Sequence, residues 1–166
     1  MVIDQATFER IYDDLAPKIF KFCYFRVSSK EEAEDIASHV FLRAWDHVAG
    51  GKEVANIQGF LYRIANNLVI DYYRKNKDKR ELSLNDPKNP IDVPDKAEFV
   101  ERIDQQMLVN QVQDVLRDLQ DNYKEIVVMR FVNDLSIKEI SYILGTSENN
   151  ISVRLHRALD KLKSLI

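Results

Sequence analysis

The 166-residue sequence has little of what a strand-rich or disulfide-bonded fold requires. Four glycines and four prolines are too few for a fold with many tight turns between strands. The single cysteine, Cys23, excludes an internal disulfide and favours a reducing compartment, and its apolar surroundings (FKFCYF) predict a buried, unreactive thiol. No apolar run reaches the ~18 residues that a membrane span needs, and the N-terminal residues lack the segments of a signal peptide. We therefore expect a soluble, cytoplasmic protein with no membrane contact of its own.

The sequence also lacks the residue patterns that catalysis or cofactor binding requires. Its three histidines, His39, His47 and His156, do not combine with Cys23 at the spacing of metal ligands. Asp35 and His39 are four residues apart on an expected helix, but such a pair is typical of a face that meets solvent or a partner. There is no P-loop and no glycine-rich nucleotide-binding motif. We expect no catalytic residue, no metal and no cofactor, and a protein that is not an enzyme.

Apolar residues at three- and four-residue steps run through most of the chain and predict an all-α fold. The first expected helix packs through Phe8, Ile11, Tyr12, Leu15, Ile19 and Phe22. Pro17 lies within this pattern, so we expect a kink there or a second helix that begins there. Ser29 begins a capping box (S-x-x-E) for the next helix, which Gly50-Gly51 ends. Asn56 can cap a third helix.

The net charge of -3 is spread unevenly along the chain. Residues 61–80 hold six basic and two acidic side chains, whereas residues 81–106 hold three basic and seven acidic ones. The acidic stretch also contains three of the four prolines, a composition typical of a flexible linker. We therefore predict two small helical domains, residues 1–80 and 107–166, joined by an acidic flexible linker at residues 81–106.

The strongest local pattern, LSIKEISYILGTSENNISVRLHRALDKLK, lies near the C-terminus. Ser136 and Glu139 form a capping box for a short helix at residues 137–144. Gly145 fits the turn that ends this helix, and Ser147 can cap a second one. Two short helices joined by a glycine-containing turn predict a helix-turn-helix. The alternative is a structural helical hairpin with a solvated face.

The second of these helices has an apolar and a polar side. The residues predicted to pack are Ile151, Leu155, Ala158, Leu159, Leu162 and Leu165. The opposite side, here called the recognition face, consists of Asn149, Ser152, Val153, His156 and Arg157. Arg154 and Lys161 flank it. Because Asn, Ser, His and Arg can all hydrogen-bond base edges in a major groove, this face is a candidate surface for double-stranded DNA.

The segment FLYRIANNLVIDYYRKNKDKR, residues 60–80, combines aromatics, asparagines and a basic end. Its expected packing stripe is Ile57, Leu61, Ile64, Leu68 and Tyr72. The opposite side, here called the basic-aromatic face, consists of Phe60, Arg63, Asn67, Arg74 and Lys77. Aromatic rings stack on unpaired bases, amides contact base edges and cations bind phosphate, so this face fits single-stranded or opening DNA. The alternative is a basic helix whose charged groups reach solvent while Phe60 lies in the core.

Taken in order, these motifs resemble the group 4, or extracytoplasmic-function (ECF), sigma factors of bacterial RNA polymerase. The resemblance rests on EEAEDI, VFLRAW, FLYRIANNL and YRKNK, then the acidic linker, then LSIKEIS, LG and RLHRALDKL. It covers nearly the whole chain. It implies a promoter-specific transcription initiation factor with a sigma-2 helical bundle and a sigma-4 helix-turn-helix domain. The partners that it implies are core RNA polymerase (its clamp coiled coil and flap), promoter DNA and an anti-sigma factor.

The resemblance also implies roles for individual positions. The clamp-binding surface corresponds to Asp35, Ser38, His39, Phe41, Arg43 and Trp45. The basic-aromatic face corresponds to the part that melts the −10 element and captures a flipped base, with the loop at residues 50–57 beside that base. The recognition face, with Arg154 and Lys161, corresponds to the part that contacts the −35 element. The linker corresponds to the segment that threads the polymerase channels toward the RNA exit.

The sequence departs from the family pattern at a few of these positions. Ser38-His39 occupies the place where the family often has glutamine followed by an acid, and Phe60 often corresponds to tryptophan. Ser152-Val153 replaces a common basic-serine pair, which removes one cation from the recognition face. The main alternative function is a stand-alone helix-turn-helix transcriptional regulator. That class would explain the C-terminal motif, but not the basic-aromatic face or the acidic linker.

Overall fold

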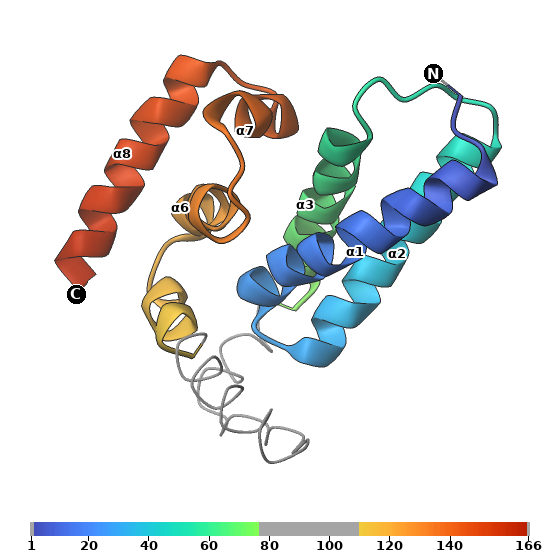
Figure 1. The fold of residues 1–166 in the computed structure, drawn as a ribbon. Helices are drawn as coiled ribbons and strands as arrows, with labels where there is room; N and C mark the ends of the chain where they lie inside the picture. Colours follow the sequence, from blue (N-terminus) through green and yellow to red (C-terminus); the bar gives the residue numbers. More distant parts are fainter. Residues whose placement is uncertain (1, 77–109, 166) are drawn as a thin grey trace, which may run out of the picture.

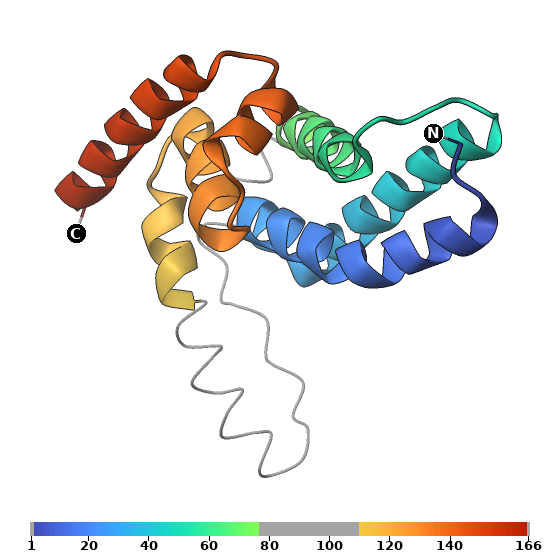
Figure 2. The same cartoon turned by 45° about the horizontal axis from the view of Figure 1, so that its top comes forward.

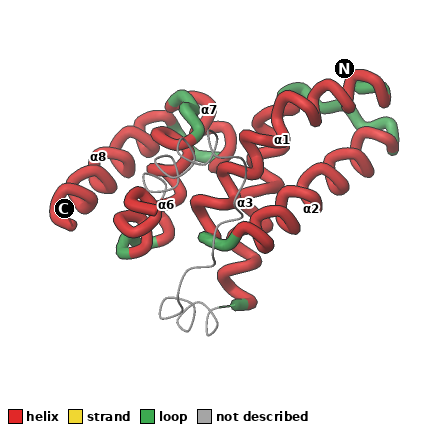
Figure 3. The backbone as a smooth tube through the Cα atoms, turned by 60° about the horizontal axis from the view of Figure 1, so that its bottom comes forward, coloured by secondary structure: helices red, strands yellow, loops and turns green. Residues whose placement is uncertain are grey.

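The computed structural model describes residues 2–76 and 110–165, and all regular structure in these ranges is helical (Figure 1, Figure 3). The N-terminal part contains α1 (Gln5–Val27), α2 (Lys30–Ala49) and α3 (Ile57–Lys75). The C-terminal part contains a helical segment at residues 110–117, α6 (Asp121–Val127), the π-helix η1 (Val128–Val132), α7 (Ile137–Leu144) and α8 (Glu148–Leu165). The all-α prediction is confirmed. The expected linker at residues 81–106 lies outside the described residues.

The ends of the N-terminal helices follow the capping residues in the sequence. The Ser29 hydroxyl accepts a hydrogen bond from the Glu32 amide at 3.4 Å, and the Asn56 side chain accepts one from the Gly59 amide at 3.0 Å. These bonds confirm the predicted starts of α2 and α3. Pro17 lies inside α1, which continues through it as one helix, so a second helix beginning at this proline is excluded. The apolar side of α1 is buried on both sides of Pro17, and this packing outweighs the hydrogen bond that proline cannot donate.

Helices α1, α2 and α3 form a bundle with an aromatic and aliphatic core. Its fully buried side chains include Ile19, Phe22, Val40, Leu61 and Tyr62. Cys23 is also fully buried, as predicted, and this burial raises the pKa of its thiol to about 12. Tyr12 does not pack in the core as expected. It is 48% exposed, and its ring packs on Phe41 in a T-shaped arrangement at 4.8 Å between centroids, at the rim of the core.

The buried face of α3 is rotated relative to the predicted packing stripe. Leu61 is the one member of that stripe that is fully buried. The other four lie half-buried at the edge of the core: Ile57, Ile64, Leu68 and Tyr72. The buried positions are instead Gly59, Leu61, Tyr62, Ala65, Asn66 and Val69. The rotation has a physical cause, since α3 packs not only on α1 and α2 but also on helices of the C-terminal part.

Within the N-terminal bundle, α3 lies on the side that faces the C-terminal helices (Figure 1, Figure 2). There α7 packs on α3 and η1 packs on α1, and the buried apolar residues of both parts form one cluster. The Asn133 side-chain amide donates to the Lys18 carbonyl at 3.0 Å and to the Tyr62 hydroxyl at 3.1 Å. Burial raises the pKa of Tyr62 to about 12, so the phenol that accepts this bond is neutral. In the described residues, therefore, the two parts are packed against each other.

Candidate nucleic-acid interface

Helices α7 and α8 form the predicted helix-turn-helix. The Ser136 amide donates to the Glu139 carboxylate at 2.9 Å, and the Glu139 amide donates to the Ser136 hydroxyl at 3.0 Å, which completes the capping box. Gly145 ends α7 in the left-handed conformation, with φ 67°. The Ser147 hydroxyl accepts from the Asn150 amide at 3.1 Å and caps α8. The turn is thus fixed at both ends, and it sets the direction in which α8 projects.

The recognition face of α8 is exposed along its length. All five of its residues face solvent: Asn149, Ser152, Val153, His156 and Arg157. On the opposite side Ile151 and Ala158 are fully buried, whereas Leu155, Leu159 and Leu162 are half-buried. Leu165 was predicted to pack but is 40% exposed, because it is the last residue of the helix. α8 lies on the side of the molecule away from α1 and α2 (Figure 1, Figure 2), so the N-terminal bundle does not cover this face.

Arg154 differs from the other basic residues of α8. Its guanidinium contacts the Glu125 carboxylate at 3.3 Å and the Asn122 carbonyl at 3.3 Å. The side chains of Arg154 and Glu125 are only 24% and 12% exposed. Arg154 therefore ties α8 to α6, whereas Lys161, the other flanking cation, is exposed.

The basic-aromatic face of α3 is only partly free. Arg63, Asn67 and Arg74 are exposed, but Arg63 Nη2 also donates to the Tyr142 carbonyl of α7 at 2.7 Å. Phe60 is half-buried, and its ring lies 4.8 Å from the ring of His47, between centroids. The side chain is thus supported by α2 and is neither fully in the core nor fully at the surface. The fifth member, Lys77, lies outside the described residues.

Sequence reasoning missed Asn66, which directly precedes the candidate Asn67. The Asn66 side chain accepts from Arg26 Nη1 at 2.8 Å and donates to Glu125 Oε1 at 2.6 Å. Because Glu125 also pairs with Arg154, side chains from α1, α3, α6 and α8 form one polar chain across both parts of the molecule. The sequence does hold a signal for Asn66: it is an amide on a side of the helix whose other residues are apolar or small.

Helix α2 exposes most of the residues expected to bind core polymerase. The exposed ones are Asp35, Ser38, His39 and Arg43, and Trp45 is half-buried. Phe41 does not reach this surface: it is 6% exposed, and its ring packs against Phe8 and Tyr12. Leu42, which the sequence reasoning missed, is 60% exposed. It follows His39 by three residues and Asp35 by seven, a helical spacing that places all three on one side.

Both helical parts match known families. Residues 11–79 match Sigma-70 region 2, and residues 110–162 match Sigma-70 region 4. Over 175 residues the chain is 30% identical to the ECF RNA polymerase sigma factor SigW of Bacillus subtilis, covering 96% of this chain and 89% of SigW. The chain belongs to the ECF sigma factors of the sigma-70 family. It is an RNA polymerase sigma factor, and a stand-alone regulator is not favoured, because the match spans both parts.

Further relatives agree with this assignment. The ECF sigma factor SigM of Bacillus subtilis is 27% identical over 96% of this sigma factor and 94% of its own length. The fold matches that of CnrH in complex with the cytosolic domain of CnrY, with a TM-score of 0.73 at 18% identity over 98% of this chain and 88% of that one. It also matches RpoE of Bartonella quintana in complex with the anti-sigma factor NepR, with a TM-score of 0.68 at 19% identity over 95% of both chains. At these identities the two structures establish a shared fold.

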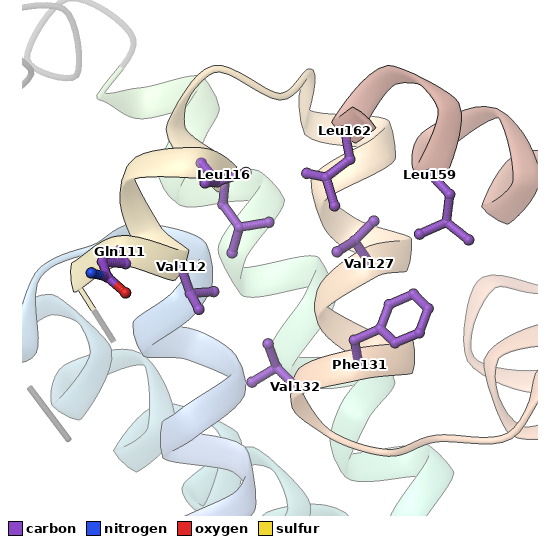
Figure 4. A pocket seen from close by; sticks show the side chains of 9 residues that line it. Gln111, Val112, Leu116, Val127, Phe131, Val132, Leu159 and Leu162 are labelled. Carbon is purple, nitrogen blue, oxygen red and sulfur yellow. The ribbon is translucent and has the colours of Figure 1, made fainter. Parts of the chain in front are cut away.

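A hydrophobic groove of about 400 Å³ lies in the C-terminal part of the sigma factor (Figure 4). Its lining residues are Gln111, Val112, Val115, Leu116, Val127, Phe131, Val132, Leu159 and Leu162. Figure 4 shows that they come from the helical segment at residues 110–117, from α6 and η1, and from α8. Among the described residues, the lining is apolar apart from Gln111.

Within residues 2–76 and 110–165, no three His, Cys, Asp or Glu side chains gather in a way that could hold a metal ion. No helix in the same ranges is both long enough and apolar enough to cross a bilayer.

Proposed function

We propose that this sigma factor recognises promoters through two helices and core polymerase through a third. The recognition face of α8 contacts the base edges of the −35 element, and the basic-aromatic face of α3 opens and captures the −10 element. The exposed side of α2 binds the clamp coiled coil. The functional units are residues 1–80 and 107–166, joined by the linker at residues 81–106. The protein acts in the cytoplasm without enzymatic activity of its own.

The observation that carries the proposal is the exposed recognition face on a capped helix-turn-helix. A helix that enters the major groove contacts bases through side chains near its N-terminal end. Asn149 and Ser152 lie in the first two turns of α8, and Arg157 follows one turn after Val153 on the same side. Arg157 can make a bidentate contact to a guanine, and the Val153 methyl groups can pack on a thymine methyl.

The polymerase-binding surface on α2 is supported by its mixture of apolar and charged groups. Leu42 is exposed among polar neighbours, including Asp35, His39 and Arg43. An apolar centre with a polar rim is the usual arrangement of a protein–protein interface. Phe41 contributes from beneath by fixing the position of α2, and Trp45 lies at the edge of the surface.

Two further contacts follow from the same proposal. The hydrophobic groove is the candidate contact for the flap of core polymerase, since its apolar lining excludes a role in phosphate binding. An anti-sigma factor is the other expected partner. The structural relative RpoE was solved with the anti-sigma factor NepR, and CnrH was solved with the cytosolic domain of CnrY.

The test is transcription in vitro with bacterial core polymerase, genomic DNA fragments and this chain. Sequencing the 5′ ends of the transcripts is expected to yield a class of start sites that share one −10 and one −35 sequence. This class should require both the chain and core polymerase. If the chain instead binds duplex operators tightly by itself and adds no start sites to core polymerase, a stand-alone regulator is the correct function.

The polymerase surface has its own test. Reversing both charges, Asp35→Lys with Arg43→Glu, should weaken binding to core polymerase without changing the helix content. The matched control is Asp14→Lys with Lys21→Glu, two exposed residues of α1. Both pairs leave the net charge unchanged. If the two variants bind core polymerase with equal affinity, the docking surface does not lie on this side of α2.

A further inference from the structure

A contact between His47 and Phe60 closes the connection between α2 and α3. Residues 50–56 join these two helices at one end of the N-terminal bundle (Figure 1). His47 lies in the last turn of α2, and Phe60 lies near the start of α3. Their rings meet at 4.8 Å between centroids with 43° between planes, within the distance range of a favourable aromatic pair. The pair therefore joins the two ends of the loop.

The backbone at both ends of this loop is held by local hydrogen bonds. The Asn56 side chain accepts from the Gly59 amide at 3.0 Å, and the Phe60 amide donates to the Asn56 carbonyl at 2.9 Å. At the end of α2, the Gly50 amide donates to the Asp46 carbonyl at 3.2 Å. These bonds fix the position of the Phe60 backbone, but they leave the direction of its side chain to other contacts.

The imidazole of His47 is the contact that can set this direction. The Phe60 side chain is half-buried, so the core covers only part of it. A phenylalanine in a helix has two common χ1 rotamers, which point its ring in different directions. Among the described residues, the His47 ring is the one aromatic ring that stacks on Phe60, and it is itself half-buried. The contact therefore favours one rotamer and leaves part of the Phe60 ring exposed.

We infer that His47 is a positioning residue for recognition of the −10 element and acts through Phe60 rather than on the DNA itself. This inference rests on the proposed function of the basic-aromatic face. A ring that is already held in one direction loses less conformational freedom when an unpaired base stacks on it. Support by His47 thus raises the affinity of the sigma factor for that base.

Substitutions at His47 separate the effect of its ring from the effects of its size and polarity. His47→Ala removes the ring, and His47→Gln keeps a polar side chain without a ring. His47→Phe is the conservative variant, because it keeps a ring that can stack on Phe60. The matched control is Ala49→Ser, an exposed position in the same turn of α2 with no change of charge. Helix content and affinity for core polymerase, measured for each variant, identify those that fold as the wild type does.

The measurement is holoenzyme affinity for a pre-melted −10 template from a promoter found by transcription in vitro. Each unpaired position carries either its base or an abasic site, and the ratio of the two affinities isolates the contribution of that base. Phe60→Ala should lower this ratio by about 5- to 150-fold at one position, because a stacked base is lost. His47→Ala and His47→Gln should lower it by about two- to tenfold at the same position. His47→Phe and Ala49→Ser should retain the wild-type ratio.

The double variant His47→Ala with Phe60→Ala shows whether His47 acts through Phe60. A residue that only positions another has no further effect once that residue is gone, so the double variant should match Phe60→Ala alone. Additive losses, or a loss at a different base, would show that His47 contacts the DNA itself and would overturn the inference. An unchanged ratio in His47→Ala, or an equal loss in His47→Phe, would also overturn it.

Phe60→Ala distinguishes a failure of this inference from a failure of the proposed function. If Phe60→Ala lowers the ratio at one base and His47→Ala does not, the role of His47 is wrong and the proposed function of α3 stands. If Phe60→Ala leaves the ratio unchanged at every position, Phe60 does not capture a base. The proposed function of this face is then wrong, and the role of His47 is wrong with it.

Discussion

The two helices proposed to contact DNA, α3 and α8, differ in how much of their candidate DNA-binding surface is exposed. All five residues of the recognition face on α8 are exposed. On α3, by contrast, Arg63 is bonded to α7 and Phe60 is half-buried against His47. Under the proposed function, α8 meets duplex DNA with its whole recognition face, whereas α3 acts later, on opened DNA, with Asn67 and Arg74 exposed and Phe60 supported by α2.

The contrast is sharpest within α3, where two neighbouring asparagines have opposite surroundings. Asn66 is buried and joins Arg26 to Glu125, whereas Asn67 is exposed. Asn66→Ala would leave the buried guanidinium of Arg26 without this acceptor, and we expect a loss of about 2–3 kcal/mol in the free energy of unfolding. Asn67→Ala should change it by less than about 0.5 kcal/mol. Urea denaturation followed by circular dichroism measures both. Similar losses in the two variants would contradict the distinction.

A second prediction concerns the exposed helix. If Arg157 makes a bidentate contact with one base, Arg157→Ala should weaken binding to the −35 element by about 1–3 kcal/mol and relax the preference at that base pair. The measurement is holoenzyme affinity for promoters that carry each of the four base pairs at every −35 position. A loss that is equal for all sequences would show that Arg157 binds phosphate instead.

The sequence was sufficient to predict much of the fold, because the relevant signals are local. Helix starts at Ser29, Asn56 and Ser136 depend on bonds that span three residues, and all three are present in the structure. The left-handed turn at Gly145 has the same local origin. The side of a helix that faces solvent is also a local property, so the whole recognition face was predicted correctly as exposed.

What the sequence could not indicate is which elements meet across the two parts of the chain. The predicted packing stripe of α3 assumed one neighbouring surface, but α3 packs on two, which rotates its buried side toward Gly59 and Asn66. Similarly, periodicity alone could not distinguish buried Phe41 from exposed Leu42, because the boundary between core and surface on α2 falls between them. The use of Arg154 as a tie to α6 depends on Glu125, 29 residues away.

A third prediction concerns Asn67 on the basic-aromatic face of α3. Asn67→Ala should leave formation of the closed promoter complex nearly intact and reduce the open complex by about 1 kcal/mol, roughly fivefold, if one amide–base hydrogen bond is lost. A template with a pre-melted −10 region should restore opening but not the base preference. Permanganate footprinting of unpaired thymines measures opening on both templates. If the Asn67→Ala variant opens duplex DNA as well as the wild type does, Asn67 does not act on the −10 element, and α3 is an ordinary basic helix.

The smallest expected effect separates positioning from specificity on α8. Lys161 is exposed and flanks the recognition face, so its ammonium group can bind a phosphate but lies outside the surface that meets base edges. Lys161→Ala should therefore weaken binding to all promoter sequences alike, by less than Arg157→Ala does. It should also reduce the slope of log affinity against log salt concentration by about 1, because one counterion fewer is released. Lys161→Arg keeps the charge and should retain the slope. A change in −35 base preference in Lys161→Ala would show that Lys161 belongs to the recognition face. An unchanged salt slope would show that Lys161 does not contact the DNA.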